Sequence, residues 1–477
     1  MKANRVVMWF RQDLRLHDNE ALQNALKKGI EVIPVYVFDE RVFFEKTRFG
    51  FRKTEKFRAK FIIESVKDLR NSFRKLGIDL IIRVGKPEEE VWTLCEKVQA
   101  KKVFCNIERT DEEIKIQDQL EQNLWSTGKE INYSRGKMLY YTQDLPFPVC
   151  QTPDVFTHFR KEVEKYINIR EPLPTPTSFN RWSIRVEAGE IPGLTDLNYE
   201  DFEWDERGVL SFKGGETEGL KRLNYYLWET NLVKKYKETR NGLIGGDYSS
   251  KFSPWLAQGC ISPKTIYATL KDYEAKQGKN KSTYWLFFEL LWRDFFRLMG
   301  KKHKNRIFWK TGTANKKIVG GDDDLQKFKN WSEGRTGVPF IDANMRELNA
   351  TGFMSNRGRQ NVASFLVKDL NINWQIGAEY FESLLIDYDA CSNYCNWNYV
   401  AGVGSDPREN RYFNILLQAK RYDPKGDYVK LWLPELKKLS PQKVHQPDTL
   451  SIDEQEEAHV IIGSDYPQAM YSTANWA

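Results

Sequence analysis

The sequence predicts a two-domain protein, with an α/β domain at the N-terminus and an all-α domain at the C-terminus. Residues 1–135 alternate short β-rich runs with helical patterns, residues 136–216 are rich in proline, and residues 217–477 follow a helical periodicity. A chain of 477 residues with 40% hydrophobic and 29% charged residues has the composition of a globular protein and the length for two or three domains. We therefore expect an N-terminal domain, an interdomain connector and a helical domain with those boundaries.

The N-terminal domain is expected to be built around a parallel β-sheet. Its β-rich runs are RVVMWF (5–10), EVIPVYVF (31–38), DLIIRVG (79–85), KKVFCNI (101–107) and EINY (130–133). Their near-continuous apolar content is typical of strands that are buried on both faces. Helices are expected between them, one beginning at Pro87 before three glutamates and one running from Thr110 to Trp125. This alternation predicts a doubly wound, Rossmann-like sheet, although no GxGxxG motif follows the first run.

Prolines separate the two domains. Seven of them, at positions 146, 148, 153, 172, 174, 176 and 192, lie between residues 139 and 216 and interrupt any long element. We expect this segment to be a connector on the surface of the domains. Helical periodicity then continues almost to residue 439, and the last twelve residues are expected to form a short tail.

Net charge, cysteine spacing and hydropathy limit which binding partners and cellular compartments are expected. The formal net charge of +7 fits an anionic partner, yet it is equally typical of a solvated surface, so nucleic-acid binding stays open. Cys391 and Cys395, the closest two of six cysteines, have a spacing unlike the usual metal or redox pair, which favours free thiols. No signal peptide is visible, and the most apolar stretch, residues 284–292, is too short to span a membrane. We expect an intracellular, cytoplasmic protein without a metal site.

The stretch DYSSKFSPWLAQGCISP, residues 247–263, predicts an anion site. Ser249, Ser250 and Lys251 lead into a helix that is expected to start with Ser253 as its N-cap and proline after it. Hydroxyl groups, free backbone N–H groups and a cation are the groups that bind a phosphate at such a place. The alternative is a capped turn between two helices.

The helix expected over residues 282–300 carries charge on one face. Glu289, Arg293 and Arg297 recur at i, i+4 and i+8, and Trp292 and Phe296 flank them. Polar groups on so aromatic a helix are costly to bury unless they have partners. These three side chains therefore either line a site or meet solvent.

Two further runs carry polar groups in unusual surroundings. SNRGRQN, residues 355–361, contains Arg359, which can pair bidentately with a carboxylate such as Asp387; a basic surface turn is the alternative. DYDACSNYCNWNYVAGVGSDP, residues 387–407, is too polar for a core strand and too aromatic for a linker, which favours a site for a flat, polar ligand. Because no HExxH, P-loop or GxSxG motif is present and the five histidines are dispersed, hydrolysis is not the leading interpretation.

Together these segments resemble the photolyase/cryptochrome flavoproteins, and most closely their cryptochrome-DASH branch. The resemblance covers about residues 5–436 and is carried by VVMWFRQDLRLHDNEAL, DYSSKFSPWLAQGCISP, ELLWRDFFRLMG, SNRGRQNVASFLVKDL, DYDACSNYCNWNYVAGVGSDPRENRYFN and QAKRYDPKGDYVKLWLPEL. It implies non-covalent FAD, bent into a U, in the helical domain. It also implies that the α/β domain is the place for an antenna chromophore, for which a folate, 5,10-methenyltetrahydrofolate, is the candidate.

The resemblance assigns a role to each candidate residue. The expected FAD contacts are Tyr236, Ser249, Ser250, Lys251, Phe252, Ser253, Glu289, Arg293, Asn356, Arg359, Asp387, Asp389 and Asn393. Within this set Arg359 and Asp387 are expected to pair against the isoalloxazine ring, and Asn393 is expected to face its N5 atom. The expected lesion pocket consists of Glu289, Trp292, Asn356, Arg357, Gln360 and Tyr399. The expected electron-hopping chain from the surface to the flavin consists of Trp331, Trp374 and Trp397, and Glu113 matches a folate contact.

The resemblance implies a light-driven lyase that passes an electron from excited reduced FAD to cyclobutane pyrimidine dimers, mainly in single-stranded DNA. RNA is an alternative ligand, and a monomer is expected. The chain departs from classical photolyases because Tyr399 replaces a second tryptophan and Gln360 stands where methionine is usual. It also lacks the histidine that (6-4) photolyases place within MSNRGRQN. Two other functions stay open, a blue-light receptor that signals through a partner and a nucleic-acid-binding flavoprotein with little turnover.

Overall fold

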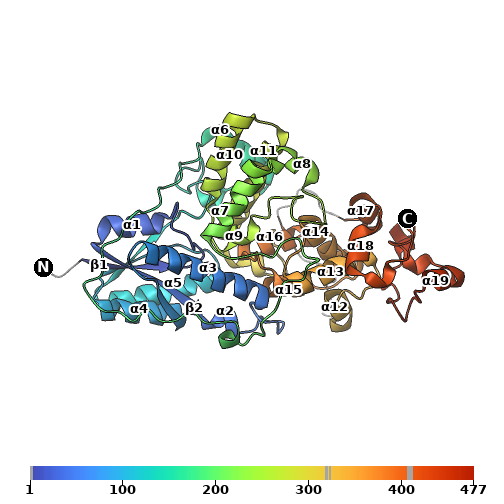
Figure 1. Ribbon diagram of the computed structural model, residues 1–477, viewed down its shortest axis with the longest axis horizontal. Coiled ribbons are helices and arrows are strands. Elements are labelled where there is room, and N and C mark those ends of the chain that lie inside the picture. Colours follow the sequence, from blue (N-terminus) through green and yellow to red (C-terminus); the bar gives the residue numbers. More distant parts are fainter. Residues whose placement is uncertain (1–3, 317–320, 322–323, 405–411, 477) are drawn as a thin grey trace.

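The computed structural model describes residues 4–316, 321, 324–404 and 412–476. The sheet domain and the C-terminal helices lie at opposite ends of the long axis of the molecule (Figure 1). Residues 405–411, near the end of the motif around Asp387, lie outside the described residues. Of the described helices, none is long and apolar enough to cross a membrane. All six cysteines carry free thiols.

The N-terminal domain contains the predicted parallel sheet. Its strands pair in the order β3-β2-β1-β4-β5, and every pair is parallel. The strands are β1 (Arg5–Phe10), β2 (Glu31–Asp39), β3 (Ile81–Gly85), β4 (Lys102–Asn106) and β5 (Glu130–Ser134). Each strand begins and ends within two residues of its prediction, because apolar runs between turn residues define strands locally.

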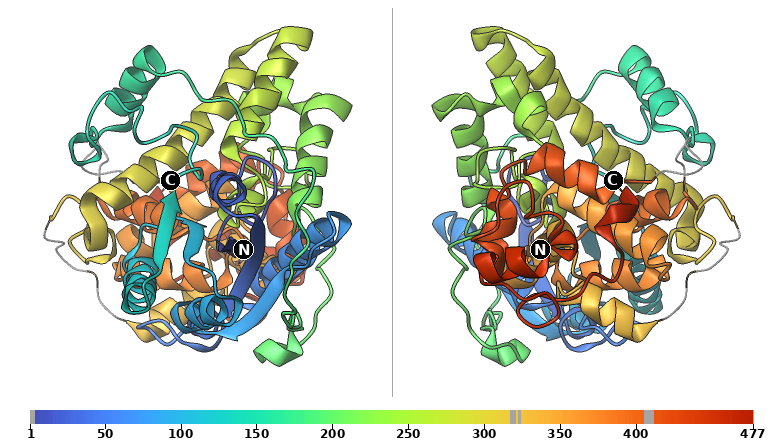
Figure 2. Two further views of the ribbon diagram at one scale, coloured as in Figure 1. Left: turned by 90° about the vertical axis from the view of Figure 1, so that its left-hand side faces the viewer. Right: turned by 90° about the vertical axis from the view of Figure 1, so that its right-hand side faces the viewer.

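Helices cover both faces of this sheet, as the left view of Figure 2 shows. They are α1 (Glu20–Lys28), α2 (Glu40–Phe44), α3 (Lys56–Lys75), α4 (Pro87–Val98) and α5 (Asp111–Ser126). Alternate side chains of β1 enter opposite layers: Val6 and Met8 pack in the core that includes α1 and α3, whereas Val7 and Trp9 pack in the one that includes α4 and α5. The doubly wound fold is thereby confirmed.

The connector is more structured than its prolines predict. It contains α6 (Phe156–Tyr166) and two short 3₁₀ helices, η1 (Val149–Gln151) and η2 (Thr195–Leu197). The interval between Pro153 and Pro172 is long enough for this helix of 11 residues. Phe156 stacks on Trp292 of the helical domain with ring centroids 3.7 Å apart, and the carbonyl of Ala188 accepts the N–H of Ile82 in β3 at 2.7 Å. The connector therefore contacts both domains.

The C-terminal domain is helical, as predicted. Its α-helices are α7 (Glu216–Asn224), α8 (Tyr236–Thr239), α9 (Ser253–Ala257), α10 (Pro263–Gln277), α11 (Lys281–His303), α12 (Leu325–Ser332), α13 (Pro339–Thr351), α14 (Asn356–Ser364), α15 (Trp374–Leu384), α16 (Ala390–Ala401), α17 (Ile415–Tyr422), α18 (Asp427–Trp432) and α19 (Ile452–Ala458). Shorter turns are η3 (Tyr225–Glu229) and η6 (Phe365–Asp369), which are π-helical, and the 3₁₀ turns η4 (Leu232–Lys235), η5 (Lys304–Phe308), η7 (Pro434–Leu436), η8 (Pro447–Thr449) and η9 (Thr473–Trp476). The expected tail is packed, since Trp476 in η9 is only 4% exposed.

Candidate functional site

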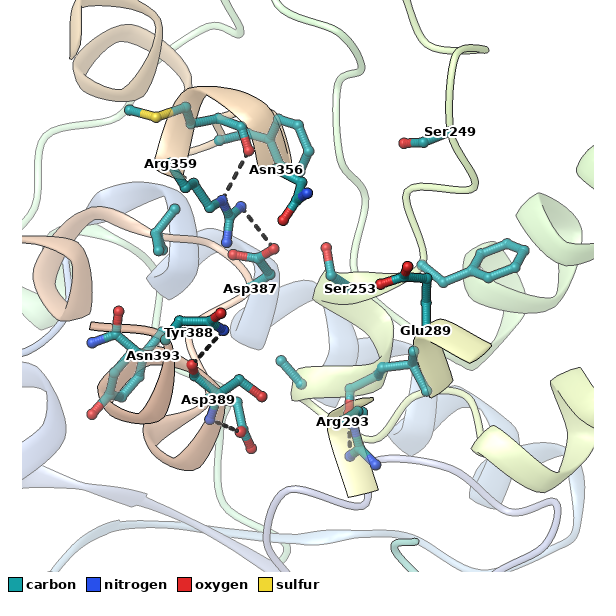
Figure 3. A pocket seen from close by; sticks show the side chains of 18 of the residues that line it. Ser249, Ser253, Glu289, Arg293, Asn356, Arg359, Asp387, Tyr388, Asp389 and Asn393 are labelled. Atoms are coloured by element: carbon teal, nitrogen blue, oxygen red, sulfur yellow. Dashed lines mark hydrogen bonds and ion pairs between the residues drawn. The ribbon is translucent and has the colours of Figure 1, made fainter. Parts of the chain in front are cut away.

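A cavity of about 330 Å³ lies inside the helical domain, within the range of roughly 300–1,000 Å³ that small-molecule sites occupy. It is lined by α8, α9, α11, α14 and α16 and by the loops before α9 and α16 (Figure 3). The predicted residues that line it are Tyr236, Ser249, Ser250, Lys251, Phe252, Ser253, Glu289, Arg293, Asn356, Arg359, Gln360, Asp387, Asp389, Asn393 and Trp397. Its apolar wall includes Leu256, Leu286, Phe353, Met354 and Val400, none of which was among the predicted site residues.

The loop before α9 forms one polar wall of the cavity. Buried Arg222 holds this loop, because its guanidinium donates to the carbonyl oxygens of Ser250 at 3.0 Å and Ser249 at 3.2 Å. Lys251 has a φ of 60°, a left-handed conformation that is costly for a side chain of this kind. Its Nζ donates to Ser249 Oγ at 3.2 Å and lies over the ring of Tyr248. The loop therefore presents serine hydroxyls from a fixed backbone.

The prediction that Ser253 caps this helix was wrong by one residue. Phe252 is the N-cap of α9, and Ser253 is its first helical residue. Phe252 already has helical dihedral angles, φ −73° and ψ −12°, so the chain enters the helix one residue early. The side chain of Ser253 still lines the cavity, on the same side as Ser249 (Figure 3).

Asp387 forms the first carboxylate on the opposite wall. Its Oδ2 accepts from Arg359 Nη2 at 2.9 Å, so the predicted pair forms. The pair is not bidentate as predicted, because Arg359 Nε donates to the Met354 carbonyl at 2.9 Å. Asp387 Oδ1 is buried and has no hydrogen-bond partner among the described residues. An orphaned buried acceptor costs about 1–3 kcal/mol, so a ligand that donates to Asp387 is favoured at this wall.

Asp389 forms the second carboxylate and starts α16. Its side chain accepts from the Ser392 N–H at 2.8 Å as the N-cap, and its Oδ2 pairs with Arg297 Nη1 at 2.9 Å. Burial raises the pKa of Asp389, but the charges of Arg297 and Arg293 outweigh it, so the pKa lies below its ordinary value. Asp389 therefore stays ionised beside the cavity.

A series of ion pairs connects Arg297 to side chains in the N-terminal part of the chain. Arg297 Nη2 pairs with Glu108 Oε2 at 3.3 Å, and Glu108 Oε1 pairs with Lys137. All three side chains are at most 4% exposed, so the alternative that the charged face of α11 meets solvent is wrong for Arg297. Sequence reasoning missed Glu108 and Lys137, because no motif contains them.

Arg293 and Asn393 are both held by backbone carbonyls. Arg293 donates to the carbonyls of Lys137 at 2.9 Å and Leu256 at 3.2 Å, and Asn393 Nδ2 donates to the carbonyl of Ala378 at 2.9 Å. Each contact crosses from one element to another. The orientation of both side chains is therefore set by hydrogen bonds to other elements and not by their own helices.

Glu289 has a partner that the sequence did not indicate. Its Oε1 pairs with Arg240 Nη1 at 2.5 Å, and the two side chains are 29% and 17% exposed. Burial raises the pKa of Glu289, and the Arg240 cation opposes this only in part, so the pKa lies above its ordinary value. A carboxyl that accepts a proton more readily than usual thus lines the cavity.

Four of the predicted lesion residues, Trp292, Arg357, Gln360 and Tyr399, form two pairs. The rings of Trp292 and Tyr399 meet edge to face with centroids 6.1 Å apart. Arg357 donates to Gln360 at 2.8 Å and to Asn241 at 3.1 Å. Of these residues, Gln360 lines the cavity itself, whereas Trp292, Arg357 and Tyr399 do not appear in its lining.

The three predicted relay tryptophans are all buried. Trp397 lines the cavity and is 2% exposed, Trp374 is 1% exposed, and Trp331 is 0% exposed. The ring of Trp331 lies 6.5 Å from that of Trp397, and its N–H donates to the Val362 carbonyl at 3.0 Å. Trp331 therefore does not reach the surface, because α12 packs this side chain into the core; the relay through the three tryptophans stays a prediction.

Glu113 lies in α5 of the α/β domain and does not line the cavity, although its charge acts on Arg297 and Cys391. Its Oε2 accepts from Thr110 N at 3.1 Å and Thr110 Oγ1 at 2.6 Å, as part of the capping box of α5. One oxygen is thus used by the helix start. The predicted contact with a folate stays a prediction.

Comparisons with known proteins match this arrangement over nearly the whole chain. The model of the family described as DNA photolyase matches residues 6–177, and the one described as FAD binding domain of DNA photolyase matches residues 285–476. Cryptochrome DASH of Gloeobacter violaceus is 51% identical over 98% of this chain and 93% of its own length, and that of Xenopus laevis is 46% identical over 99% and 90%.

Solved structures of similar proteins have the same fold over the whole chain. A Synechocystis cryptochrome, 47% identical, has a TM-score of 0.96 and covers 100% of this chain and 98% of its own. A class III photolyase of Agrobacterium tumefaciens, 29% identical, has a TM-score of 0.87 and covers 100% and 96%.

Proposed function

The chain belongs to the photolyase and cryptochrome family, in its cryptochrome-DASH branch, and from this premise we propose that it splits cyclobutane pyrimidine dimers with light. The observation that carries the proposal is the cavity, which has an ion pair with an unsatisfied oxygen on one wall and a carboxyl of raised pKa on another. A hydrolytic site would need an activated nucleophile beside a base, and the sequence contains no HExxH, P-loop or GxSxG motif.

The residues present fit FAD. Ser249, Ser250 and Ser253 are proposed to hold the diphosphate, since hydroxyls and backbone N–H groups suit phosphate oxygens. The unpaired oxygen of Asp387 and the ionised Asp389 are proposed to accept hydrogen bonds from the isoalloxazine ring. When bound, FAD supplies an excited state that transfers a single electron.

Glu289 is proposed to act on the lesion. A carboxyl group can bond to the pyrimidine edge and stabilise the negative charge that develops on the dimer only during reaction, which is the kind of interaction that accelerates a step. Burial raises the pKa of Glu289, which favours the protonated, donating form more than in a solvent-exposed carboxyl. Arg240 competes for the same carboxylate and would keep it in place before substrate binds.

A preference for single-stranded DNA is proposed from Tyr399, whose ring meets that of Trp292, and from Gln360. Flipping bases out of a duplex costs a few kcal/mol, and stacking on aromatic side chains returns roughly 1–3 kcal/mol per base. Tyr399 offers a smaller face than tryptophan, and Gln360 replaces an apolar contact with an amide. If these changes remove about 1–2 kcal/mol, occupancy of the flipped state in a duplex falls by about tenfold or more.

The test is light-dependent repair of one dimer placed in matched single-stranded and duplex oligonucleotides at the same salt concentration. We expect faster repair in the single strand, no repair in darkness, and a gain of duplex repair in Tyr399→Trp. Equal repair of both substrates would refute the strand preference. A lack of light-dependent repair on either substrate would refute the enzyme and favour a receptor or binding protein.

A folate antenna is proposed from the family alone. Glu113 Oε1 has no partner among the described residues, so this oxygen is available to a ligand although Oε2 caps α5. The chromophores released from the purified protein by denaturation identify the antenna. Glu113→Gln should lower the folate content without changing the FAD content.

A further inference from the structure

The half-buried ring of Trp292, one wall of the proposed lesion pocket, is covered on one face by the connector. The inference in this subsection rests on the proposed function, because only the family resemblance places Trp292 beside the lesion. Phe156, the first residue of α6, lies parallel to Trp292, with the ring centroids 3.7 Å apart and an angle of 10° between the planes. This distance matches the optimal separation of carbon atoms in contact. A phenyl ring therefore occupies one face of the indole.

The start of α6 is fixed to α11 on both sides of this contact. On one side, Lys302 Nζ donates to the carbonyl of Thr152 at 2.8 Å. On the other side, Arg160 Nη1 donates to the hydroxyl of Tyr284 at 2.6 Å. Lys302 and Tyr284 lie near opposite ends of α11. The segment from residue 152 to residue 160 therefore follows α11 and has little freedom to move away from Trp292.

Phe156 is also held by two phenylalanines of α11. It is 5% exposed, and its ring meets those of Phe288 and Phe295 edge to face, with centroids 5.1 Å and 5.6 Å apart. A side chain in so closely packed an environment keeps one rotamer, because any other would collide with its neighbours. The plane of Phe156 is therefore fixed before any ligand binds.

We infer that Phe156 is a positioning residue for lesion recognition, which holds Trp292 in one orientation. A flipped base can then stack on one face of the indole only. Trp292 also meets Tyr399 edge to face at 6.1 Å, so the orientation of the indole sets the angle between these two walls.

This arrangement favours a dimer over undamaged bases. Two bases that a cyclobutane ring joins are rigid, and they gain most from two walls at a fixed angle. Ordering an aromatic side chain on binding costs affinity, and a side chain that is already ordered avoids this cost. Phe156 thus increases the affinity for the dimer without touching it.

The experiment measures, in darkness, how tightly the FAD-containing protein binds a single-stranded oligonucleotide with one thymine dimer and the same oligonucleotide without damage. The ratio of the undamaged to the damaged dissociation constant reports lesion recognition, since contacts with the phosphates are common to both. Phe156→Leu should lower this ratio by about three- to tenfold, because Trp292 is then free to turn. The repair yield at saturating substrate should stay close to that of the wild type, since Phe156 does not line the cavity.

Phe159→Leu is the matched control. Phe159 lies on the same helix, is 0% exposed and packs on Phe295 at 5.5 Å, but among the described residues no ring contact joins it to Trp292. Equal losses in the two variants would make Phe156 an ordinary core residue and overturn the inference. Phe156→Met, which fills the space with a flexible side chain, is the second variant if Phe156→Leu binds less FAD than the control.

A double-mutant cycle tests whether Phe156 acts through Trp292. In a Trp292→Ala background, Phe156→Leu should lower the ratio no further. A further loss of the same size in that background, or a wild-type ratio in Phe156→Leu alone, would overturn the inference. A wild-type protein that binds damaged and undamaged strands equally would instead refute the lesion recognition on which the proposed function depends.

Discussion

Asp387 and Asp389 lie two residues apart on one wall of the cavity, but they are held in different ways. Asp387 pairs with Arg359, which is 26% exposed and belongs to the same domain, and one of its oxygens has no partner among the described residues. Asp389 pairs with Arg297, which is 4% exposed, and the charges continue to Glu108 of the α/β domain. The first pair is thus arranged for a ligand, and the second is arranged to join the domains.

The largest expected effect comes from breaking the buried pair. Arg297→Met leaves Asp389 and Glu108 without their shared cation, and removing one partner of a buried ion pair costs roughly 3–5 kcal/mol. We expect a loss of that size in the free energy of unfolding of the apoprotein, measured by urea denaturation. Arg306→Met, an exposed position just after α11, is the control and should change it by less than about 1 kcal/mol. Equal effects of both substitutions would contradict the role of the interdomain pair.

The next expected effect is a dependence of stability on pH at Glu347, a buried carboxyl without an arginine bonded to it. Burial raises its pKa to about 7, although a hydrogen bond from Tyr428 and the charges of Lys251 and Arg359 oppose this. The unfolded chain therefore releases the proton at lower pH than the folded one. Stability from this group is present below about pH 4.5 and falls by about 3 kcal/mol as pH rises through 7.

Glu347→Gln checks this prediction, because an amide keeps the shape and does not titrate. Both proteins are denatured with urea at pH 5, 6, 7 and 8. The free energy of unfolding of the variant should rise relative to that of the wild type as the pH rises. A constant difference between the two would mean that Glu347 is already ionised in the fold. Asp389, whose pKa is lowered, provides the contrast: a directly bonded guanidinium keeps it charged.

The pair that faces the ligand should affect FAD more than folding. Asp387→Ala removes a charge-assisted hydrogen bond, typically about 1.5–3 kcal/mol, which corresponds to roughly 10- to 100-fold in the dissociation constant of FAD. The ratio of FAD to purified protein and a titration of the apoprotein measure the effect. Because Arg359 can reach solvent, the unfolding midpoint should move less than in Arg297→Met. Full FAD occupancy in the variant would exclude Asp387 from the site.

The smallest effect on stability is expected at Glu289. This side chain and its partner Arg240 are 29% and 17% exposed, so the pair is worth little to the fold. Glu289→Gln should leave the melting temperature nearly unchanged and lower the quantum yield of dimer repair. An unchanged yield would remove Glu289 from the reaction, and a large drop in melting temperature would make it a structural residue like Arg297.

The sequence by itself determined the elements and most of the cavity wall. Apolar runs between turns predicted all five strands of the sheet, and Pro87 with the glutamates after it predicted the start of α4. Ser249, Arg359 and Asp387 stand in contiguous motifs, and the resemblance of those motifs to the photolyase/cryptochrome family implied their place in the site. The same reasoning predicted the bond between Arg359 and Asp387, which joins two such motifs.

Only the tertiary structure decided which groups complete the site. Arg297 and Glu108 are separated by 189 residues along the chain, and no local pattern relates them. Burial of Trp331 depends on how α12 packs on α15, where its ring stacks on Phe381. Periodicity shows which face of an element is apolar, but it does not show which distant element covers that face. For this reason the ion-pair partners of the charged side chains and the burial of Trp331 could be read only from the fold.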